Sequence, residues 1–359
     1  MPNSGLFVTL YDEDTLKLYL QRGIYGFLMP PVYGEVSKKS RHYHALADYA
    51  CVRDGTHVFF FLKRKIIYGG QITGPINHGA FYINGPFSPL GRLTNAVVYW
   101  DESVRGKYGE TGEPGVFTLP GSNDVRCQPY LIQFSDKLNI KGRFIKSDRL
   151  YVEIGRFPYP LPTNTISGMG FCTMTPGEVT AALQLLTEHS MGTYESTCSE
   201  DVSLVGNPIQ FDTVHGFTST RVAFERDLVT SEAHLEAFIL ANPSLLPDDL
   251  RPPTGAVLCR QVPMSPFKPY QMDRANICYY SDPLIKGGTV PNTILELKIE
   301  RVGKKEVLQV IRYLEWLYVV LPDEAHAVQV YLAGPSLARN CDTHLPQEYR
   351  NQIRFFRLM

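Results

Sequence analysis

Five side chains in the last third of the chain suggest, by their types and their order, metal-assisted cleavage of a phosphodiester. Asp273 comes first, Glu296 and Lys298 follow two residues apart, and Gln309 and Tyr313 lie four residues apart further on. Carboxylate oxygens are the ligands that Mg²⁺ and Mn²⁺ prefer, and a lysine beside such an ion can orient or deprotonate an attacking water. The set predicts a nuclease site with Mg²⁺ or Mn²⁺ as cofactor.

The carboxylate and the lysine are expected on a β-strand over 293–299. Side chains alternate along a strand, so Glu296 and Lys298 share one face while the other face is aliphatic. Burying such charges costs several kcal/mol unless they are paired or bound. A divalent cation held by Asp273 and Glu296 would offset that cost, and the backbone carbonyl of Leu297 would be a further ligand. The alternative is a Glu–Lys pair on a solvated sheet face.

A helix is expected over 304–321, directly after this strand. Gln309 and Tyr313 lie one turn apart on a face distinct from the aliphatic stripe, so both are expected to point toward the site. Lys304 and Lys305, in the first turn, are well placed to contact a DNA backbone. The stripe itself consists of Val307, Val310, Ile311, Leu314, Leu317 and Tyr318.

Residues 231–359 predict the element order α-β-β-β-α-β. The first helix has Ser231 as its N-cap and stops at Asn242-Pro243. Strands are expected over 256–261, 272–280, 293–299 and 327–333, with the helix over 304–321 before the last of them.

This order and these residues resemble the PD-(D/E)xK restriction-endonuclease-like superfamily, in particular its NucS-type and Shedu-type nuclease domains. The resemblance covers about residues 230–335. It implies that Asp273 and Glu296 bind the metal, that Lys298 is catalytic, and that a glutamate of the first helix adds a water-mediated ligand. Glu232 matches the family position for that glutamate, and Glu236, one turn on, is the alternative. The matching residues are Ser231-Glu232, Asn242-Pro243, Leu245-Leu246, Asp273, Glu296-Leu297-Lys298, Gln309 and Tyr313.

The chain departs from the family pattern at two places. The stretch between Asp273 and Glu296 is longer than the compact hairpin that the family has, and 281–292 reads as an insertion. Met272 stands where many members have proline. Neither departure removes a functional group.

The expected fold is mixed α+β or α/β, with a β-rich part over 1–190, a connection over 191–230 and the nuclease domain over 231–359. In the first part, helices are expected over 12–23 and 177–189 and strands over 56–62, 65–74, 128–134 and 148–155, with a turn at Asp54-Gly55. Thr175, Pro176 and Glu178 predict a capping box.

The region around Tyr25-Gly26-Phe27 and 54–61 resembles the core of PUA-like domains, which include the EVE, YTH and ASCH folds. That resemblance implies an aromatic pocket that holds a flipped base by stacking. Tyr25, Trp100 and Phe134 are the candidates for it, and plain core packing is the alternative for each.

Composition excludes several other classes. The seven cysteines are scattered without a Cys-x-x-Cys, which predicts reduced thiols and no zinc ribbon. No Walker loop and no Gly-x-Ser-x-Gly occur. His42 and His44, two apart, would share a strand face, but no third ligand is near them.

Net charge is −1, so DNA contact would depend on local basic patches. No run has the length of a membrane span and no signal pattern begins the chain, so a cytoplasmic location is expected.

Three functions stay open at this point. The first is a divalent-metal-dependent DNA endonuclease with an N-terminal recognition domain, of the kind used in restriction or phage defence together with partner proteins. The second is a nucleic-acid or nucleotide sensor whose nuclease fold is silent. The third is a repair nuclease that acts on branched or mismatched DNA. Double-strand cleavage would favour a homodimer, since one such site cuts one strand.

Overall fold

The computed structural model describes most of the two regions in which the sequence predicts regular elements. The described residues are 3–10, 12–31, 40–73, 81–83, 109–110, 116–118, 123–153, 171–194, 231–241, 243, 246–264, 273–281 and 290–358. The expected connection over 191–230 lies, apart from its first four residues, outside them. Within the described part of the chain, no helix combines the length and the apolar composition needed to cross a membrane.

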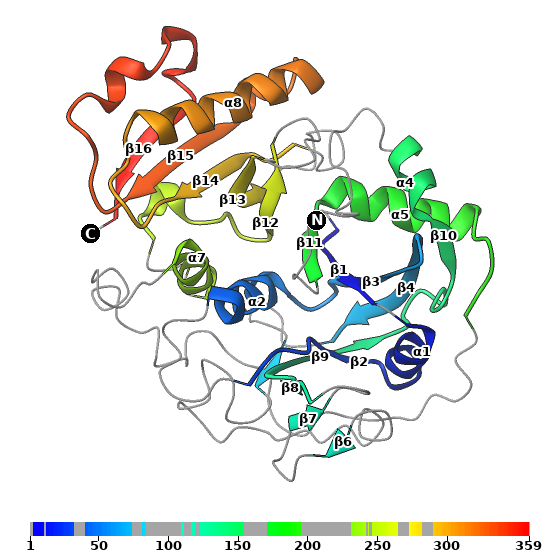
Figure 1. Cartoon of the computed structure of the whole chain (residues 1–359). Helices are drawn as coiled ribbons and strands as arrows, with labels where there is room; N and C mark the ends of the chain where they lie inside the picture. Colours follow the sequence, from blue (N-terminus) through cyan, green and yellow to red (C-terminus); the bar gives the residue numbers. More distant parts are fainter. Residues whose placement is uncertain are drawn as a thin grey trace.

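A curled eight-stranded sheet forms the first half of the molecule (Figure 1). Its main path runs β11-β1-β3-β4-β9-β2, with β10 on β4 and β5 on β9. The β1–β3 pair is parallel, and the other pairs are antiparallel. The strands are β1 (Gly5–Thr9), β2 (Ile24–Gly26), β3 (His57–Leu62), β4 (Lys65–Ile72), β5 (Tyr82–Ile83), β9 (Tyr130–Ser135), β10 (Phe144–Lys146) and β11 (Phe171–Met174). A small separate sheet contains β6 (Gly109–Glu110), β7 (Val116–Thr118) and β8 (Val125–Cys127).

A five-stranded sheet in the order β12-β13-β14-β15-β16 forms the second half. The β12–β13 and β13–β14 pairs are antiparallel, whereas β14–β15 and β15–β16 are parallel. The elements are α7 (Glu232–Ala241), β12 (Val257–Pro263), β13 (Arg274–Tyr280), β14 (Thr293–Leu297), α8 (Lys304–Val320), β15 (Gln329–Gly334) and β16 (Ile353–Arg357). The predicted order α-β-β-β-α-β is therefore present, and β16 extends it by a strand that the sequence analysis missed.

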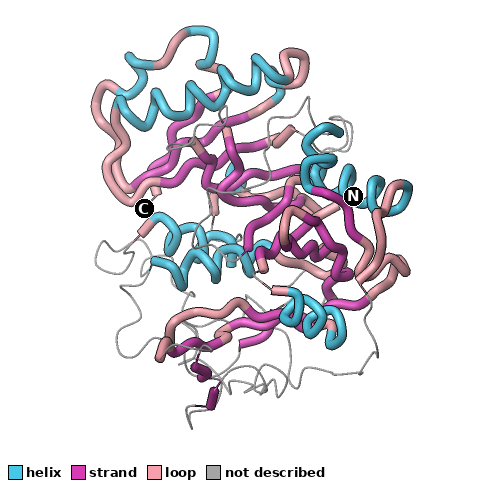
Figure 2. Tube along the Cα trace, turned by 45° about the vertical axis from the view of Figure 1, so that its right-hand side comes forward, coloured by secondary structure: helices cyan, strands magenta, loops and turns pink. Residues whose placement is uncertain are grey.

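Among the described residues, four helices complete the first half: α1 (Glu13–Arg22), α2 (Ser40–Cys51), α4 (Ser147–Glu153) and α5 (Pro176–Glu188). Helix α2 packs beside α7 between the two sheets, and α8 covers the opposite face of the second sheet (Figures 1 and 2). One hydrophobic cluster runs without interruption from α1 through α2 and α7 to the second sheet. The two halves therefore share a core, which the expected division into separate domains did not anticipate.

Local signals determine several boundaries as predicted. Asp12 caps α1 by accepting from the N–H of Thr15 at 2.8 Å, and Gly23 ends it with a left-handed φ of 64°. Gly55, with φ of 81°, makes the turn before β3. Helix α5 has the predicted capping box, in which the Glu178 carboxylate accepts from the Thr175 N–H at 2.7 Å.

Two segments of the first half differ from expectation. Residues 40–51 form α2, so positions 42 and 44 lie about 200° apart around a helix and do not share a strand face. The buried residues Leu46, Tyr49 and Ala50 have helical spacing. The predicted strand over 148–155 is wrong, because Ser147–Glu153 is helix α4. The β-favouring Tyr151 and Val152 suggested a strand, but here α4 packs on α5 and buries Leu150.

The capping box gives a testable pH dependence. Burial raises the pKa of Glu178 to about 7, from 4.5. A carboxyl group with a raised folded pKa contributes its full stability below its unfolded pKa and loses it as the pH rises through the folded value. We expect wild type to lose about 3 kcal/mol of unfolding free energy between pH 4.5 and 8 that Glu178→Gln does not lose. Urea unfolding of both proteins at the two pH values measures this difference.

The matched control is Glu188→Gln, at the exposed end of the same helix. It should follow the pH dependence of wild type. Equal pH dependence of wild type and Glu178→Gln would contradict the prediction.

Candidate active site

The second sheet opens between β13 and β14. Their antiparallel register ends at the pair Ile277–Leu295, whereas β14 continues its parallel pairing with β15 to the pair Leu297–Ala333. Beyond Ile277 the N–H of Asn276 is 3.3 Å from the Glu296 carboxylate instead of pairing with the opposite backbone. The parting of the strands therefore places a carboxylate where a ladder hydrogen bond would otherwise lie.

Glu296 is the centre of the predicted site and is almost fully buried, with 1% of its surface exposed. Its Oε1 lies 2.8 Å from the Nζ of Lys298, and its Oε2 lies 3.2 Å from the hydroxyl of Tyr313. Burial raises the pKa of Glu296 to about 7, although the Lys298 ammonium acts in the opposite direction. This is not the solvated Glu–Lys pair of a sheet surface.

Lys298 lies between two carboxylates. Its Nζ is 3.3 Å from Glu232 Oε1 on α7, in addition to its contact with Glu296. Burial lowers the pKa of Lys298, but the Glu296 carboxylate more than offsets this, so the pKa is raised and the side chain is held as an ammonium. An ammonium can orient a water and stabilise negative charge, but it cannot accept a proton.

The helix residues also reach the site. Gln309 donates to the Tyr313 hydroxyl at 2.6 Å, and that hydroxyl is 2.8 Å from the Arg274 carbonyl and 3.2 Å from Glu296. Its single proton can serve one of these two acceptors at a time. Tyr313 is fully buried and belongs to the same apolar cluster as Val310 and Leu314. The expectation that it lies on a face separate from the aliphatic stripe is therefore wrong.

Asp273 lies just before β13 but is paired with an arginine. Its two carboxylate oxygens accept from Nε and an NH₂ group of Arg312 at 2.8 and 3.1 Å. Arg312 precedes Tyr313 on α8, so this pair lies beside the cluster around Glu296. No feature of the sequence pointed to Arg312.

The donor chemistry fits a hard divalent cation, but the carboxylates are occupied. Glu296, Glu232 and Asp273 offer only oxygen donors, the kind that Mg²⁺ and Mn²⁺ take. A cation already bridges the first two in the form of the Lys298 ammonium. Among the described residues no three His, Cys, Asp or Glu side chains converge as a metal site. Asp273 would have to exchange Arg312 for the ion.

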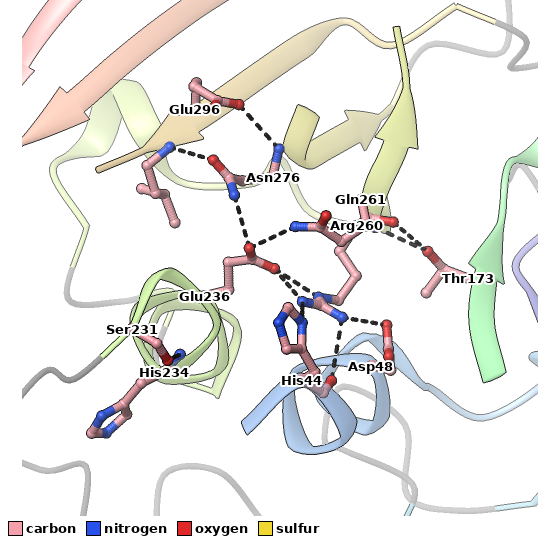
Figure 3. A network of polar contacts seen from close by, with 11 residues as sticks. His44, Asp48, Thr173, Ser231, His234, Glu236, Arg260, Gln261, Asn276 and Glu296 are labelled. Atoms are coloured by element: carbon pink, nitrogen blue, oxygen red, sulfur yellow. Dashed lines mark hydrogen bonds and ion pairs between the residues drawn. The ribbon is translucent and has the colours of Figure 1, made fainter. Parts of the chain in front are cut away.

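Glu232 and Glu236, the two alternatives for the helix carboxylate, have different surroundings. Glu232 is partly exposed and contacts Lys298. Glu236 is fully buried and forms an ion pair with Arg260 of β12 (Figure 3). The geometry therefore favours Glu232 as the carboxylate that can reach a metal.

The residues expected to contact DNA or a flipped base differ in how exposed they are. Lys304 and Lys305 are exposed in the first turn of α8. Tyr25 is buried, 2% exposed, between Tyr19 and Phe60, so it does not line an open base pocket. Phe134 is likewise core, and Trp100 lies outside the described residues.

Leu297, expected as a carbonyl ligand, has its side chain in the shared core and its N–H bonded to the Asn276 side chain at 2.8 Å. The sequence did not suggest Asn276, because Asp273 was the only residue of the expected strand over 272–280 that was considered as a site residue. The residue lies three positions after Asp273, on the strand that faces Glu296.

Comparisons with protein-family models, with curated proteins and with solved structures found no match to the chain.

Proposed function

We propose that the chain is a divalent-metal-dependent nuclease that hydrolyses phosphodiesters in DNA. The observation that carries the proposal is the buried Glu296 carboxylate at the point where β13 and β14 part, with Lys298 beside it. A carboxylate in such a place is costly for folding alone. Perturbed carboxyl groups of this kind gather at functional sites.

The element order supports the same proposal. The second sheet has two antiparallel pairs followed by two parallel pairs. Helix α7 precedes this sheet, and α8 follows β14. This arrangement agrees with the restriction-endonuclease-like fold that the sequence resembles. On this basis the second half is the nuclease part and the β-rich half selects the DNA, whether by sequence or by a modified base.

Each residue of the site has a role in this proposal. Glu296, Asp273 and Glu232 would hold the ion, together with the carbonyl of Leu297, and the ion would polarise the phosphate and activate a water. Lys298, held as an ammonium, orients that water and stabilises the charge that develops on the phosphate oxygens. Tyr313 and Gln309 hold Glu296 in place. Lys304 and Lys305 would contact the backbone of the substrate.

Cleavage of supercoiled plasmid and of DNA with modified cytosine, in Mg²⁺ or Mn²⁺ and in chelator, tests the proposal. We expect metal-dependent nicking or linearisation, and a loss of about 100-fold or more in Lys298→Ala. Arg301→Ala, which removes an exposed cation three residues on, is the matched control and should cut like wild type. Wild type that cuts neither DNA in either metal, or Lys298→Ala that cuts equally well, would rule the proposal out.

A silent nuclease fold that binds DNA without cutting it is the second candidate. The bidentate Arg312–Asp273 pair favours it, because that pair occupies a carboxylate that the reaction needs. Mn²⁺ titration separates the two candidates: an active site binds the ion and displaces Arg312, whereas a silent one does not. Arg312→Ala should then raise Mn²⁺ affinity in an active site.

A further inference from the structure

Asn276 joins the two sides of the opening between β13 and β14. Its Oδ1 accepts from the Leu297 N–H at 2.8 Å, and its Nδ2 donates to Glu236 Oε1 at 2.8 Å. The partners fix the orientation of the amide, since one is a donor and the other a carboxylate. The peptide it holds connects Glu296 to Leu297, so this side chain fixes the backbone that carries the central carboxylate.

Glu236, the other partner of Asn276, is itself held from several sides. Its Oε2 accepts from Arg260 Nε at 2.7 Å, and its Oε1 also accepts from Gln261 at 2.8 Å. Gln261 has a left-handed φ of 53° and stands opposite Asn276 between two paired positions of β12 and β13. The side-chain amides of Asn276 and Gln261 therefore both donate to the same oxygen, Oε1 of Glu236.

Arg260 continues this connection into the first half of the molecule (Figure 3). Its guanidinium donates to Asp48 Oδ1 of α2 at 2.8 Å and to the backbone carbonyl of His44 at 3.2 Å. It also lies 3.0 Å from His44 Nδ1. An unbroken series of contacts therefore runs from α2 through Arg260, Glu236 and Asn276 to the peptide beside Glu296.

Burying this series of polar groups costs free energy unless each group is hydrogen bonded to or ion-paired with another. Arg260 and Glu236 have no exposed side-chain surface, and Asp48 is 4% exposed. An apolar residue at 276 would leave both the Leu297 N–H and a Glu236 oxygen without that partner, and unpaired buried groups are strongly unfavourable. Packing alone would not select an amide at this position.

We propose that Asn276 is a positioning residue for the cleavage site and makes the geometry around Glu296 depend on helix α2. Asp48 holds Arg260, Arg260 holds Glu236, and Glu236 orients the amide that fixes the peptide between Glu296 and Leu297. The β-rich half thus supplies part of the support of the nuclease site. This inference rests on the proposed function.

A reciprocal exchange tests it. Asn276→Asp places two carboxylates against each other, and Glu236→Gln removes the acceptor charge that orients Asn276. In the double variant the hydrogen bond is reversed, because the new amide on α7 can donate to the new carboxylate on β13, which still accepts from the Leu297 N–H. The readouts are the Mn²⁺ dissociation constant from calorimetry and separate kcat and KM values for plasmid cleavage. Thermal unfolding checks the fold of each variant.

We expect each single change to weaken Mn²⁺ binding by about 10-fold or more and to lower kcat with little change in KM for DNA. The double variant should recover most of the lost affinity. Gln261→Ala is the matched control, because it removes a hydrogen bond to the same Glu236 oxygen without touching Leu297, and it should bind Mn²⁺ like wild type. Asn276→Ser serves in place of Asn276→Asp if the latter does not fold.

Wild type that binds Mn²⁺ and cuts DNA, with Asn276 variants that do both equally well, overturns the inference and leaves the proposed function standing. An equal loss of affinity in Gln261→Ala and Asn276→Ser also overturns it, since general loosening would then explain the effect. Wild type that neither binds Mn²⁺ nor cuts overturns both proposals.

Discussion

Glu296→Gln should reduce phosphodiester cleavage by about 1000-fold or more while leaving the fold intact. The amide has the shape of the carboxylate and keeps an acceptor for the Asn276 N–H and the Tyr313 hydroxyl. It lacks the charge that a divalent cation requires from a ligand in this position. Lys298 loses its nearer partner but keeps Glu232 at 3.3 Å. The measurements are plasmid nicking in Mn²⁺ and Mn²⁺ binding by calorimetry.

Stability should not fall in this variant. Burial raises the pKa of Glu296, so its ionised form is unfavourable to folding at neutral pH, and we expect the unfolding free energy of Glu296→Gln to equal or exceed that of wild type. Glu300→Gln, an exposed change just beyond the strand, is the control and should keep both cleavage and Mn²⁺ binding. Undiminished cleavage in Glu296→Gln would remove Glu296 from the site.

Arg260→Met should destabilise the protein by about 3 to 5 kcal/mol, the largest effect we expect on folding. Methionine fills similar space, but Asp48 and Glu236 would remain buried without their cation. Burial lowers the pKa of Arg260, but the two carboxylates outweigh it and raise the pKa, so the guanidinium is charged in the folded protein. Urea unfolding measures the loss.

The matched control for this change is Arg64→Met. Arg64 pairs with Asp148 at 2.7 Å, but its side chain is 77% exposed. Water screens an exposed pair of this kind, so its loss should change the unfolding free energy very little. If the two substitutions have equal costs, the buried network does not stabilise the fold.

The sequence predicted the second half of the molecule well because its signals are local. Alternating apolar residues, the Ser231 cap and the long stripe of α8 locate their elements from neighbouring residues alone, and the predicted elements around the site begin within two residues of their expected starts. Glu296, Lys298, Gln309 and Tyr313 lie close together, as strand alternation and helix periodicity indicated, but Tyr313 also belongs to the apolar cluster of α8, which the sequence did not predict.

What the sequence could not provide depends on contacts between distant segments. Arg260, Glu236 and Asp48 belong to three elements, and Asp48 lies 212 positions from Arg260. No local pattern marks Arg312 as the partner of Asp273 either. The short helix α4 was predicted as a strand because its residues favour β structure. Packing against α5 overrides that preference.

The shared core around α2 and α7 also bears on how such a chain can change over evolution. A catalytic part that passes between proteins as an interchangeable module must bring a complete set of buried contacts with it. Here the apolar side of α7 is completed by α2, and the charge of Arg260 is balanced in part by Asp48. Recombination that replaced the β-rich half would expose the apolar side of α7 and leave the buried charge of Arg260 without the balancing charge of Asp48. Under the proposed function, a new DNA specificity would therefore be acquired more readily by substitutions in surface residues of the β-rich half than by exchange of that half.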